Sequence, residues 1–168
     1  MMRAFLALAP LALITASAQA ASSTVMLKSA SGPAGTAVLT DAPKGLLIHI
    51  EASGLTPGWH AIHIHEKGDC SDAAFKMAGA HVHAMTPAVH GLLNPAANDQ
   101  GDLPNIYAAA DGSAKADLFT ATASLSGAIG AKLLDADGSA IVIHAKPDDY
   151  TTQPIGGAGD RVVCGIVK

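Results

Sequence analysis

The chain has 168 residues, of which 49% are hydrophobic, 14% are charged and 4% are aromatic. So much apolar content with so little charge excludes an intrinsically disordered chain. The formal net charge of -4 excludes the basic surplus that nucleic-acid-binding proteins carry, so no nucleic-acid partner is expected. Seventeen glycines and nine prolines indicate many turns and few long helices.

The N-terminus has the pattern of a secretory signal peptide. Arg3 gives a positive start, residues 5–16 are almost wholly apolar, and residues 18–20 have the small-x-small pattern of a cleavage site. The apolar run is about a dozen residues, short of the roughly twenty that cross a bilayer, although a retained membrane anchor is the alternative. We therefore expect residues 1–20 to be removed, leaving one domain over residues 21–168 with no membrane span.

Short apolar or alternating runs recur between turn signals, and each run predicts a strand. These runs cover residues 25–28, 36–40, 46–52, 60–65, 115–119, 131–134, 140–144 and 161–166. Eight short strands predict an all-β sandwich or flattened barrel. Residues 66–104 and 145–160 are too long for turns, and long ordered loops in compact domains are usually functional.

Export changes the interpretation of two cysteines and one arginine. An exported chain meets an oxidising compartment, so Cys70 and Cys164 are predicted to form a disulfide, with two buried thiols as the alternative. Arg161 is the one arginine left after residues 1–20 are removed. Because lysine otherwise supplies the positive charge, a lone arginine indicates a use for its planar fork of donors, with an ordinary surface arginine as the alternative.

The histidines indicate a metal site. His63 and His65 alternate in an apolar run, and residues i and i+2 of a strand point to the same face. Such a pair supplies half of a metal site, although a bare pair can also be packed or at the surface. Further candidate ligands lie in or beside the long loops: His81, His83, His90, Asp99, Asp102 and His144. Four or more imidazoles favour copper or zinc, and the lack of a cysteine cluster argues against an iron–sulfur site or a cysteine-rich zinc site.

Five segments carry a more specific pattern. They are GWHAIHIHEKGDC (58–70), AGAHVH (78–83), HGLLNPAANDQGDLPN (90–105), IHAKPDD (143–149) and GGAGDRVVCG (156–165). In this order they resemble the copper/zinc superoxide dismutase family, most of all its exported bacterial branch. The resemblance implies a Greek-key β-barrel or sandwich of about eight antiparallel strands with two long functional loops. It also implies a periplasmic enzyme, monomeric or homodimeric, whose substrate is superoxide.

The resemblance implies a role for each matching residue. The expected copper ligands are His63, His65, His81 and His144. The expected zinc ligands are His90 and Asp102 together with His81, which would bridge the two metals and carry a proton. Asp148 would fix a copper ligand and a zinc ligand, and His60 would pack at the barrel end. The disulfide would pin the metal-site loop, and Arg161 would hold the anionic substrate as a catalytic residue.

The sequence departs from the family at several of these positions. Asp99 stands where the family has a third zinc histidine; it can ligate zinc through oxygen, and His83 is the competitor, or neither residue binds. Asp160 precedes Arg161 and could pair with it or repel superoxide, while Ala61 and Ile62 replace the usual glycine and aromatic residue. Two other functions stay open: an exported copper-binding protein with little dismutase activity, and a structural β-sandwich with a decayed site.

Overall fold

The computed structural model describes residues 20–168. The predicted signal peptide therefore lies outside the described residues except for Ala20. No helix within residues 20–168 is long and apolar enough to cross a membrane.

Strands dominate the described chain, with one short 3-10 helix, η1, at Lys76–Ala78. The strands are β1 (Ser22–Ser29), β2 (Gly32–Ala42), β3 (Gly45–Ala52), β4 (Gly58–His60), β5 (Ile62–His65), β6 (Ile106–Ala108), β7 (Ala114–Thr120), β8 (Ala123–Ser124), β9 (Ala131–Lys132), β10 (Ser139–His144) and β11 (Arg161–Val167). The all-β prediction is confirmed.

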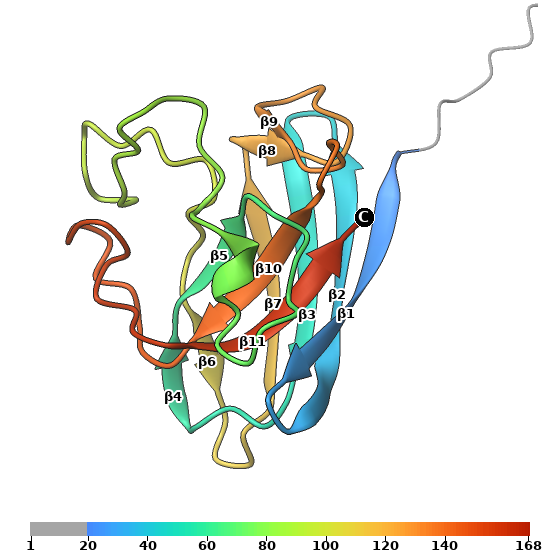
Figure 1. Cartoon of the computed structure of the whole chain (residues 1–168), viewed down its shortest axis with the longest axis vertical. Coiled ribbons are helices and arrows are strands. Elements are labelled where there is room, and N and C mark those ends of the chain that lie inside the picture. The colour runs from blue at the N-terminus through green and yellow to red at the C-terminus, as the bar shows by residue number, and fades with distance from the viewer. Residues whose placement is uncertain (1–19) are drawn as a thin grey trace, which may run out of the picture.

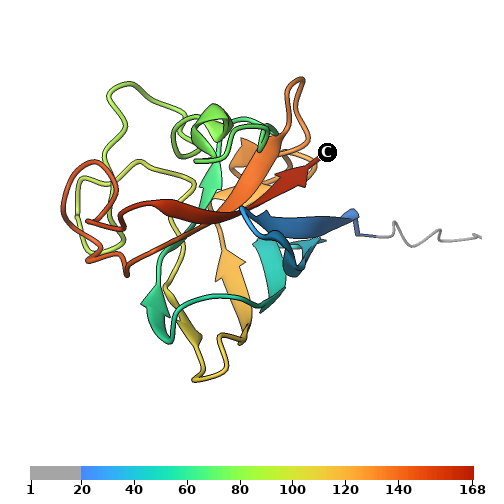
Figure 2. The ribbon, with the colours of Figure 1, turned by 60° about the horizontal axis from the view of Figure 1, so that its bottom comes forward.

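The main sheet has seven antiparallel strands in the order β5-β10-β11-β1-β2-β3-β7. It curls on itself, as Figures 1 and 2 show. The two edge strands of this sheet, β5 and β7, are linked through β4 and β6. Strand β4 continues into β5 past Ala61 and pairs with β6, and β6 leads into β7. This linkage closes the barrel, and the crossing from β3 to β4 with the return of β7 beside β3 agrees with the Greek-key prediction.

Each of the eight predicted runs contains a strand, but three details differ. The run 60–65 breaks at Ala61, whose amide donates to the carbonyl of Lys146 in the second long loop at 2.9 Å. The run 131–134 shortens to β9, which pairs in parallel with β8 and so departs from the antiparallel prediction. Strands β6 and β8 were missed, because strands of three and two residues carry little periodic signal.

The core follows the period-two alternation of the strands. In β3, Leu46, Ile48 and Ile50 are fully buried inside the barrel while Leu47 and His49 face outward. Strand β10 is buried on both faces, because its outer side is covered by the first long loop. Phe75 of that loop packs there with the two cysteines in a second apolar cluster.

Much of the two long loops predicted at 66–104 and 145–160 projects from one side of the barrel, at the left in Figures 1 and 2. Gln153 joins them: its side chain accepts from the amide of His90 at 2.9 Å and donates to the His90 carbonyl at 2.8 Å. Gly91 makes the close approach possible, since a Cβ there would lie 2.2 Å from the Tyr150 carbonyl oxygen. The loops therefore form one joined structure over the histidines.

Candidate metal centre

Four buried imidazoles converge where β5, β10 and the first long loop meet. His63 and His65 come from β5, His144 ends β10, and His81 comes from the loop, which is held by an isolated bridge between His65 and His81. One nitrogen from each ring lies within 4.8 Å of the others. The predicted copper ligands are thus brought together in space.

The free nitrogens of these rings fit a metal. The buried side-chain nitrogens and oxygens without a hydrogen-bond partner in the described chain are four: Nδ1 of His63 and Nε2 of His65, His81 and His144. A buried polar atom without a hydrogen-bond partner costs about 1–3 kcal/mol. Four such ring nitrogens gathered within 4.8 Å therefore indicate one ligand that all four bind. A copper ion accepting four imidazole lone pairs satisfies all of them.

The opposite nitrogen of each ring is anchored, which fixes the tautomer. His63 Nε2 donates to Asp148 Oδ2 at 2.9 Å, His65 Nδ1 to the Gly79 carbonyl at 3.0 Å, and His144 Nδ1 to the Gly159 carbonyl at 3.2 Å. With the proton on the anchored side, the facing nitrogen presents a lone pair.

Burial keeps these three imidazoles neutral. It lowers the pKa of His63 and of His65, and with the nearby His63 ring it lowers the pKa of His144 to about 3. Neutral imidazole is the form that binds metal. The lone pairs are therefore available at neutral pH without prior loss of a proton.

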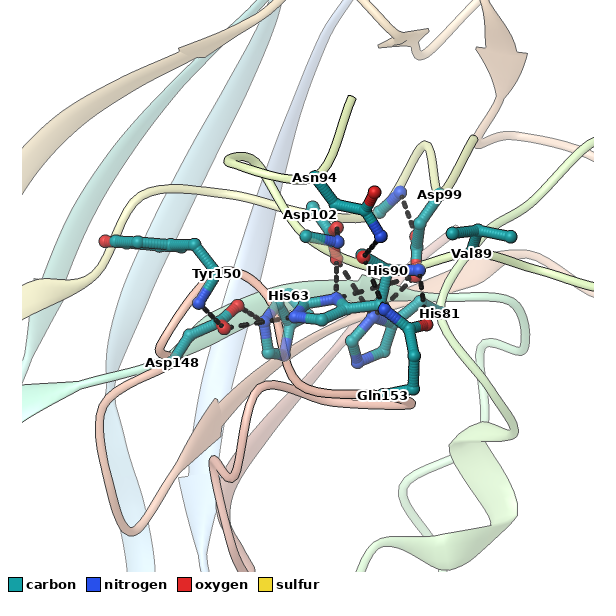
Figure 3. Close-up of polar contacts among 12 residues, drawn as sticks. His63, His81, Val89, His90, Asn94, Asp99, Asp102, Asp148, Tyr150 and Gln153 are labelled. Atoms are coloured by element: carbon teal, nitrogen blue, oxygen red, sulfur yellow. Dashed lines mark hydrogen bonds and ion pairs between the residues drawn. The ribbon is translucent and has the colours of Figure 1, made fainter. Parts of the chain in front are cut away.

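A second group of donors gathers at Nδ1 of His81, the ring nitrogen opposite the partnerless Nε2 (Figure 3). Asp102 Oδ1 accepts from His81 Nδ1 at 3.1 Å and from His90 Nδ1 at 2.7 Å, and the ligand atoms of His63, His81, His90 and Asp102 fall within 4.8 Å of one another. His63 belongs more closely to the first group, because its Nε2 is held by Asp148. The mixture of nitrogen and carboxylate oxygen suits zinc.

Asp99 joins this second group and His83 does not. Asp99 Oδ2 lies 2.9 Å from His81 Nδ1 and 3.9 Å from His90 Nδ1. His83 Nδ1 instead donates to the His81 carbonyl at 2.7 Å, and its side chain lines a separate hollow with Glu66 and Lys132. The geometry favours Asp99 over its competitor.

The carboxylates of this group hold protons on the histidines. Burial would lower the pKa of His90, but hydrogen bonds to Asp102 and Asp148 outweigh it and raise the pKa to about 10. The pKa of His81 is also raised against burial by Asp102 and Asp99. Burial works against ionised Asp102, yet the two histidines hold its pKa below the usual range. A divalent cation would replace these protons as the positive charge.

Asp148 links the two groups. Its Oδ2 accepts from His63 and its Oδ1 accepts from His90 Nε2 at 3.0 Å. The Asn105 side chain fixes the Asp148 backbone through two hydrogen bonds, donating to its carbonyl and accepting from its amide, each at 2.9 Å. Sequence reasoning missed Asn105 and also Gly156, which packs against the Asp148 carboxylate. Both lie inside the matched segments, which was the available signal.

His60 is placed as predicted, away from both groups. Its ring is buried, with Nδ1 2.7 Å from the His144 carbonyl and Nε2 2.7 Å from the Thr56 carbonyl. From the end of β4, the ring thereby ties the segment that precedes β4 to the end of β10.

Arg161 faces an open hollow of about 330 Å³ that is also lined by His81, His90, Asp99 and Ile155. Its two terminal nitrogens donate to the carbonyls of Phe75 and Gly79 at 2.7 and 2.6 Å. The guanidinium is therefore fixed in place while half-buried beside the histidines. Asp160 is exposed and makes no ion pair with Arg161 within the described chain, so of the two alternatives for Asp160 the structure shows no pairing.

The predicted disulfide between Cys70 and Cys164 is confirmed. It fastens the first long loop to β11, next to the carbonyls that hold Arg161. The same Gly79 carbonyl that receives Arg161 also receives His65, so one loop segment positions a cation and an imidazole together.

Comparison with known proteins agrees with this geometry. The family described as copper/zinc superoxide dismutase (SODC) matches residues 33–167. The chain is 60% identical over 149 residues to "Superoxide dismutase [Cu-Zn]" of Caulobacter vibrioides, covering 88% of this chain and 86% of that protein. It is 38% identical over 135 residues to "Superoxide dismutase [Cu-Zn] 2" of Aquifex aeolicus, covering 80% and 78%.

Two solved structures are similar in fold. A superoxide-dismutase-like protein from Bacillus subtilis has a TM-score of 0.79 at 37% identity, covering 86% of this chain and 97% of that one. The Cu/Zn superoxide dismutase from Brucella abortus has a TM-score of 0.71 at 29% identity, covering 88% and 100%. With the family match across most of its length, the chain belongs to the copper/zinc superoxide dismutase family.

Proposed function

We propose that this chain is a superoxide dismutase that converts two superoxide anions and two protons into dioxygen and hydrogen peroxide. The observation that carries the proposal is the set of four partnerless imidazole nitrogens converging beside a fixed arginine. When bound there, copper supplies reversible one-electron chemistry between Cu(II) and Cu(I). Imidazole donors suit both oxidation states.

The copper ligands in this proposal are His63, His65, His81 and His144. Their rings come from β5, β10 and an anchored loop, so the donor geometry is held by the barrel. Such rigidity limits the rearrangement that accompanies electron transfer.

Arg161 draws superoxide into the hollow and orients it. A guanidinium that is fixed by two carbonyls offers its charge to a small anion without first having to be ordered. His81 can hold a proton at Nε2 when that nitrogen is not ligating, and it lines the same hollow. It is the group placed to pass a proton to the departing peroxide.

Zinc is assigned to His81, His90, Asp99 and Asp102, with Asp148 fixing the His63 and His90 rings. The contacts of Asp99 with His81 support this set over one containing His83. Zinc bound by these residues would hold His81 and the loop in place through His81 Nδ1, the ring nitrogen opposite the partnerless Nε2.

We also propose that residues 1–20 are a cleaved signal peptide and that residues 21–168 act in the periplasm. The disulfide supports an oxidising compartment. The mature chain is expected as a monomer or a homodimer.

The test is the rate of superoxide decay per bound copper, measured by pulse radiolysis on the mature protein loaded with copper and zinc. We expect a fast rate that falls as salt rises, since steering is electrostatic. Arg161→Ala should slow it by about tenfold or more, and Arg161→Lys should recover part of the loss. A rate no better than that of copper on a simple peptide would leave an exported copper-binding protein instead.

A further inference from the structure

Arg161 donates to the carbonyl of Phe75, and the peptide group that carries this carbonyl is held from its other end by Asp72. The amide of the same peptide group belongs to Lys76, and it donates to Asp72 Oδ2 at 3.0 Å. A trans peptide group is planar, so its amide and its carbonyl point in opposite directions. Because Asp72 fixes the amide, it also directs the carbonyl toward Arg161.

Asp72 holds the whole turn around this peptide group. Its Oδ2 also accepts from the amide of Ala74 at 3.2 Å, and its Oδ1 accepts from the amide of Met77 at 2.9 Å. Phe75 lies within this turn with φ of +54°, a left-handed conformation that a residue with a Cβ disfavours. Three hydrogen bonds to one charged carboxylate offset this strain. The direction of the Phe75 carbonyl therefore depends on the Asp72 side chain.

Glu66 acts on the second carbonyl in the same way. Arg161 donates to the Gly79 carbonyl, and the amide of that peptide group belongs to Ala80 and donates to Glu66 Oε1 at 3.1 Å. A Cβ at Gly79 would lie 2.5 Å from the same oxygen, so only glycine lets the carboxylate lie this close. The Gly79 carbonyl also accepts from His65. Glu66 thus directs an acceptor that a cation and an imidazole share.

The two carboxylates act on the guanidinium without binding it. The terminal nitrogens of Arg161 donate to carbonyl oxygens, and neither Asp72 nor Glu66 forms an ion pair with it among residues 20–168. A carboxylate on the far end of a peptide group polarises that group and strengthens its carbonyl as an acceptor. The other N–H groups of the guanidinium are left for an anion. Burial lowers the pKa of Arg161, and the charge of Asp72 acts in the opposite direction.

We propose that Asp72 and Glu66 are positioning residues for Arg161, each of which orients one of its carbonyl acceptors across a single peptide group. Neither carboxylate lines the hollow of about 330 Å³ that Arg161 faces, so both act through Arg161 and not on the anion itself. The inference rests on the proposed function only in taking Arg161 as the residue that receives superoxide. How firmly the guanidinium is held can be measured independently of activity.

The first measurement is the rate at which phenylglyoxal, a reagent for guanidinium groups, modifies Arg161 in the metal-loaded mature protein. Arg161 is the one arginine of residues 21–168, so mass spectrometry of its peptide reports this side chain alone. Modification requires the guanidinium to leave its carbonyl partners. Asp72→Ala and Glu66→Ala should therefore react about tenfold faster than the wild type, the factor that one hydrogen bond to a charged group represents. Asp72→Asn and Glu66→Gln keep a weaker amide acceptor and should show smaller increases.

The second measurement is the superoxide decay rate of the same variants at low and at high salt. By charge alone, removal of a carboxylate near the hollow would raise the rate at low salt. We expect instead a fall of about tenfold at both salt concentrations, because a small misplacement of an orienting group is costly. The opposite signs separate positioning from a simple effect of charge. Copper content is measured alongside, since Glu66 also affects the acceptor of His65.

Asp69→Ala is the matched control. Asp69 lies in the same loop, and its Oδ1 accepts from the amide of Ser71 at 2.8 Å. The carbonyl of that peptide group belongs to Cys70, and Arg161 does not donate to it. The control therefore removes a carboxylate and a hydrogen bond of the same kind without changing either acceptor of Arg161. Its rate of modification should match that of the wild type.

Three results would overturn the inference. They are wild-type rates of modification in both alanine variants when circular dichroism shows a folded barrel, an equal acceleration in Asp69→Ala, and faster superoxide decay at low salt in the alanine variants. Where an alanine variant does not fold, a wild-type rate of modification in its amide counterpart has the same meaning. Slow superoxide decay in the wild type together with the expected rates of modification would instead refute the proposed enzyme and leave the positioning roles standing.

Discussion

The contact between Gly156 and Asp148 allows one substitution to test how both metal sites depend on the second long loop. Gly156 has φ of +59°, and a Cβ built on it would lie 1.6 Å from Asp148 Oδ1, 2.5 Å from its Cγ and 2.9 Å from His90 Nε2. Real Cβ contacts are essentially never under 3.0 Å. Gly156→Ala therefore forces the carboxylate to retreat by roughly 1.4 Å or the loop to lift.

That displacement is large compared with the hydrogen bonds that it disturbs. Asp148 accepts from His63 and His90 at 2.9 and 3.0 Å, and contacts beyond about 3.6 Å no longer count as hydrogen bonds. A hydrogen bond to a charged group contributes about 1.5–3 kcal/mol. Loss of a group that orients metal ligands typically lowers metal affinity by about 10- to 100-fold. We expect losses in this range for zinc and smaller ones for copper, which keeps three other ligands.

The assay is competition for zinc and copper against a chromogenic chelator, with thermal unfolding followed in parallel. Gly157→Ala is the matched control, because Gly157 also has a positive φ of +68° but a Cβ there meets nothing within 4 Å. It carries the backbone strain of the substitution, about 1–2 kcal/mol, without the clash. Equal metal affinities in the two variants would refute the reasoning.

Three further predictions concern the disulfide, pH and Asp160. Replacing Cys70 and Cys164 by serine should lower stability by about 4–5 kcal/mol on the chain-entropy model for a separation of 94 residues; an unchanged unfolding temperature would contradict it. In the metal-free protein, the raised pKa of His90 stabilises the fold fully below about pH 6.5, and this stabilisation is lost as pH rises toward about 10. The lowered pKa of His144 stabilises the fold above about pH 6.5, and this is lost as pH falls toward about 3. Urea unfolding of the metal-free chain should therefore give maximal stability near neutral pH, whereas a steady rise from pH 7 to 10 would be inconsistent. Asp160→Ala should raise the superoxide decay rate modestly at low salt and leave it unchanged at high salt, since the exposed carboxylate acts only by screened charge; a lower rate at low salt would reject this role.

Much of the fold could be predicted from local sequence patterns. The alternation of β3 and the apolar run of β10, with the turn residues between strands, are local features, so the eight runs can be identified from the amino-acid sequence alone. The missed strand β6 and the parallel pair of β8 and β9 are very short, and β6 depends on a partner distant in sequence. Such pairing has no local periodicity to reveal it.

The ligand identities were also accessible from sequence, through five ordered segments that match a family. At a position where the chain departs from that family, the residue type does not decide the role. Asp99 and His83 are both possible donors by residue type, and the choice depends on where two loop segments direct their side chains. The bridge between His83 and Asp99 pairs their backbones, yet the two side chains have different surroundings.

By itself, the sequence determined an all-β chain with a histidine-rich centre, a disulfide and a family resemblance that the comparisons confirm. Only the tertiary structure decided which nitrogen of each ring is free, that Asn105 and Gly156 hold Asp148, and that Arg161 is fixed by two loop carbonyls. The physical reason is that ring tautomers and side-chain directions are set by hydrogen bonds between segments far apart in the chain, and these exist only once the barrel has closed.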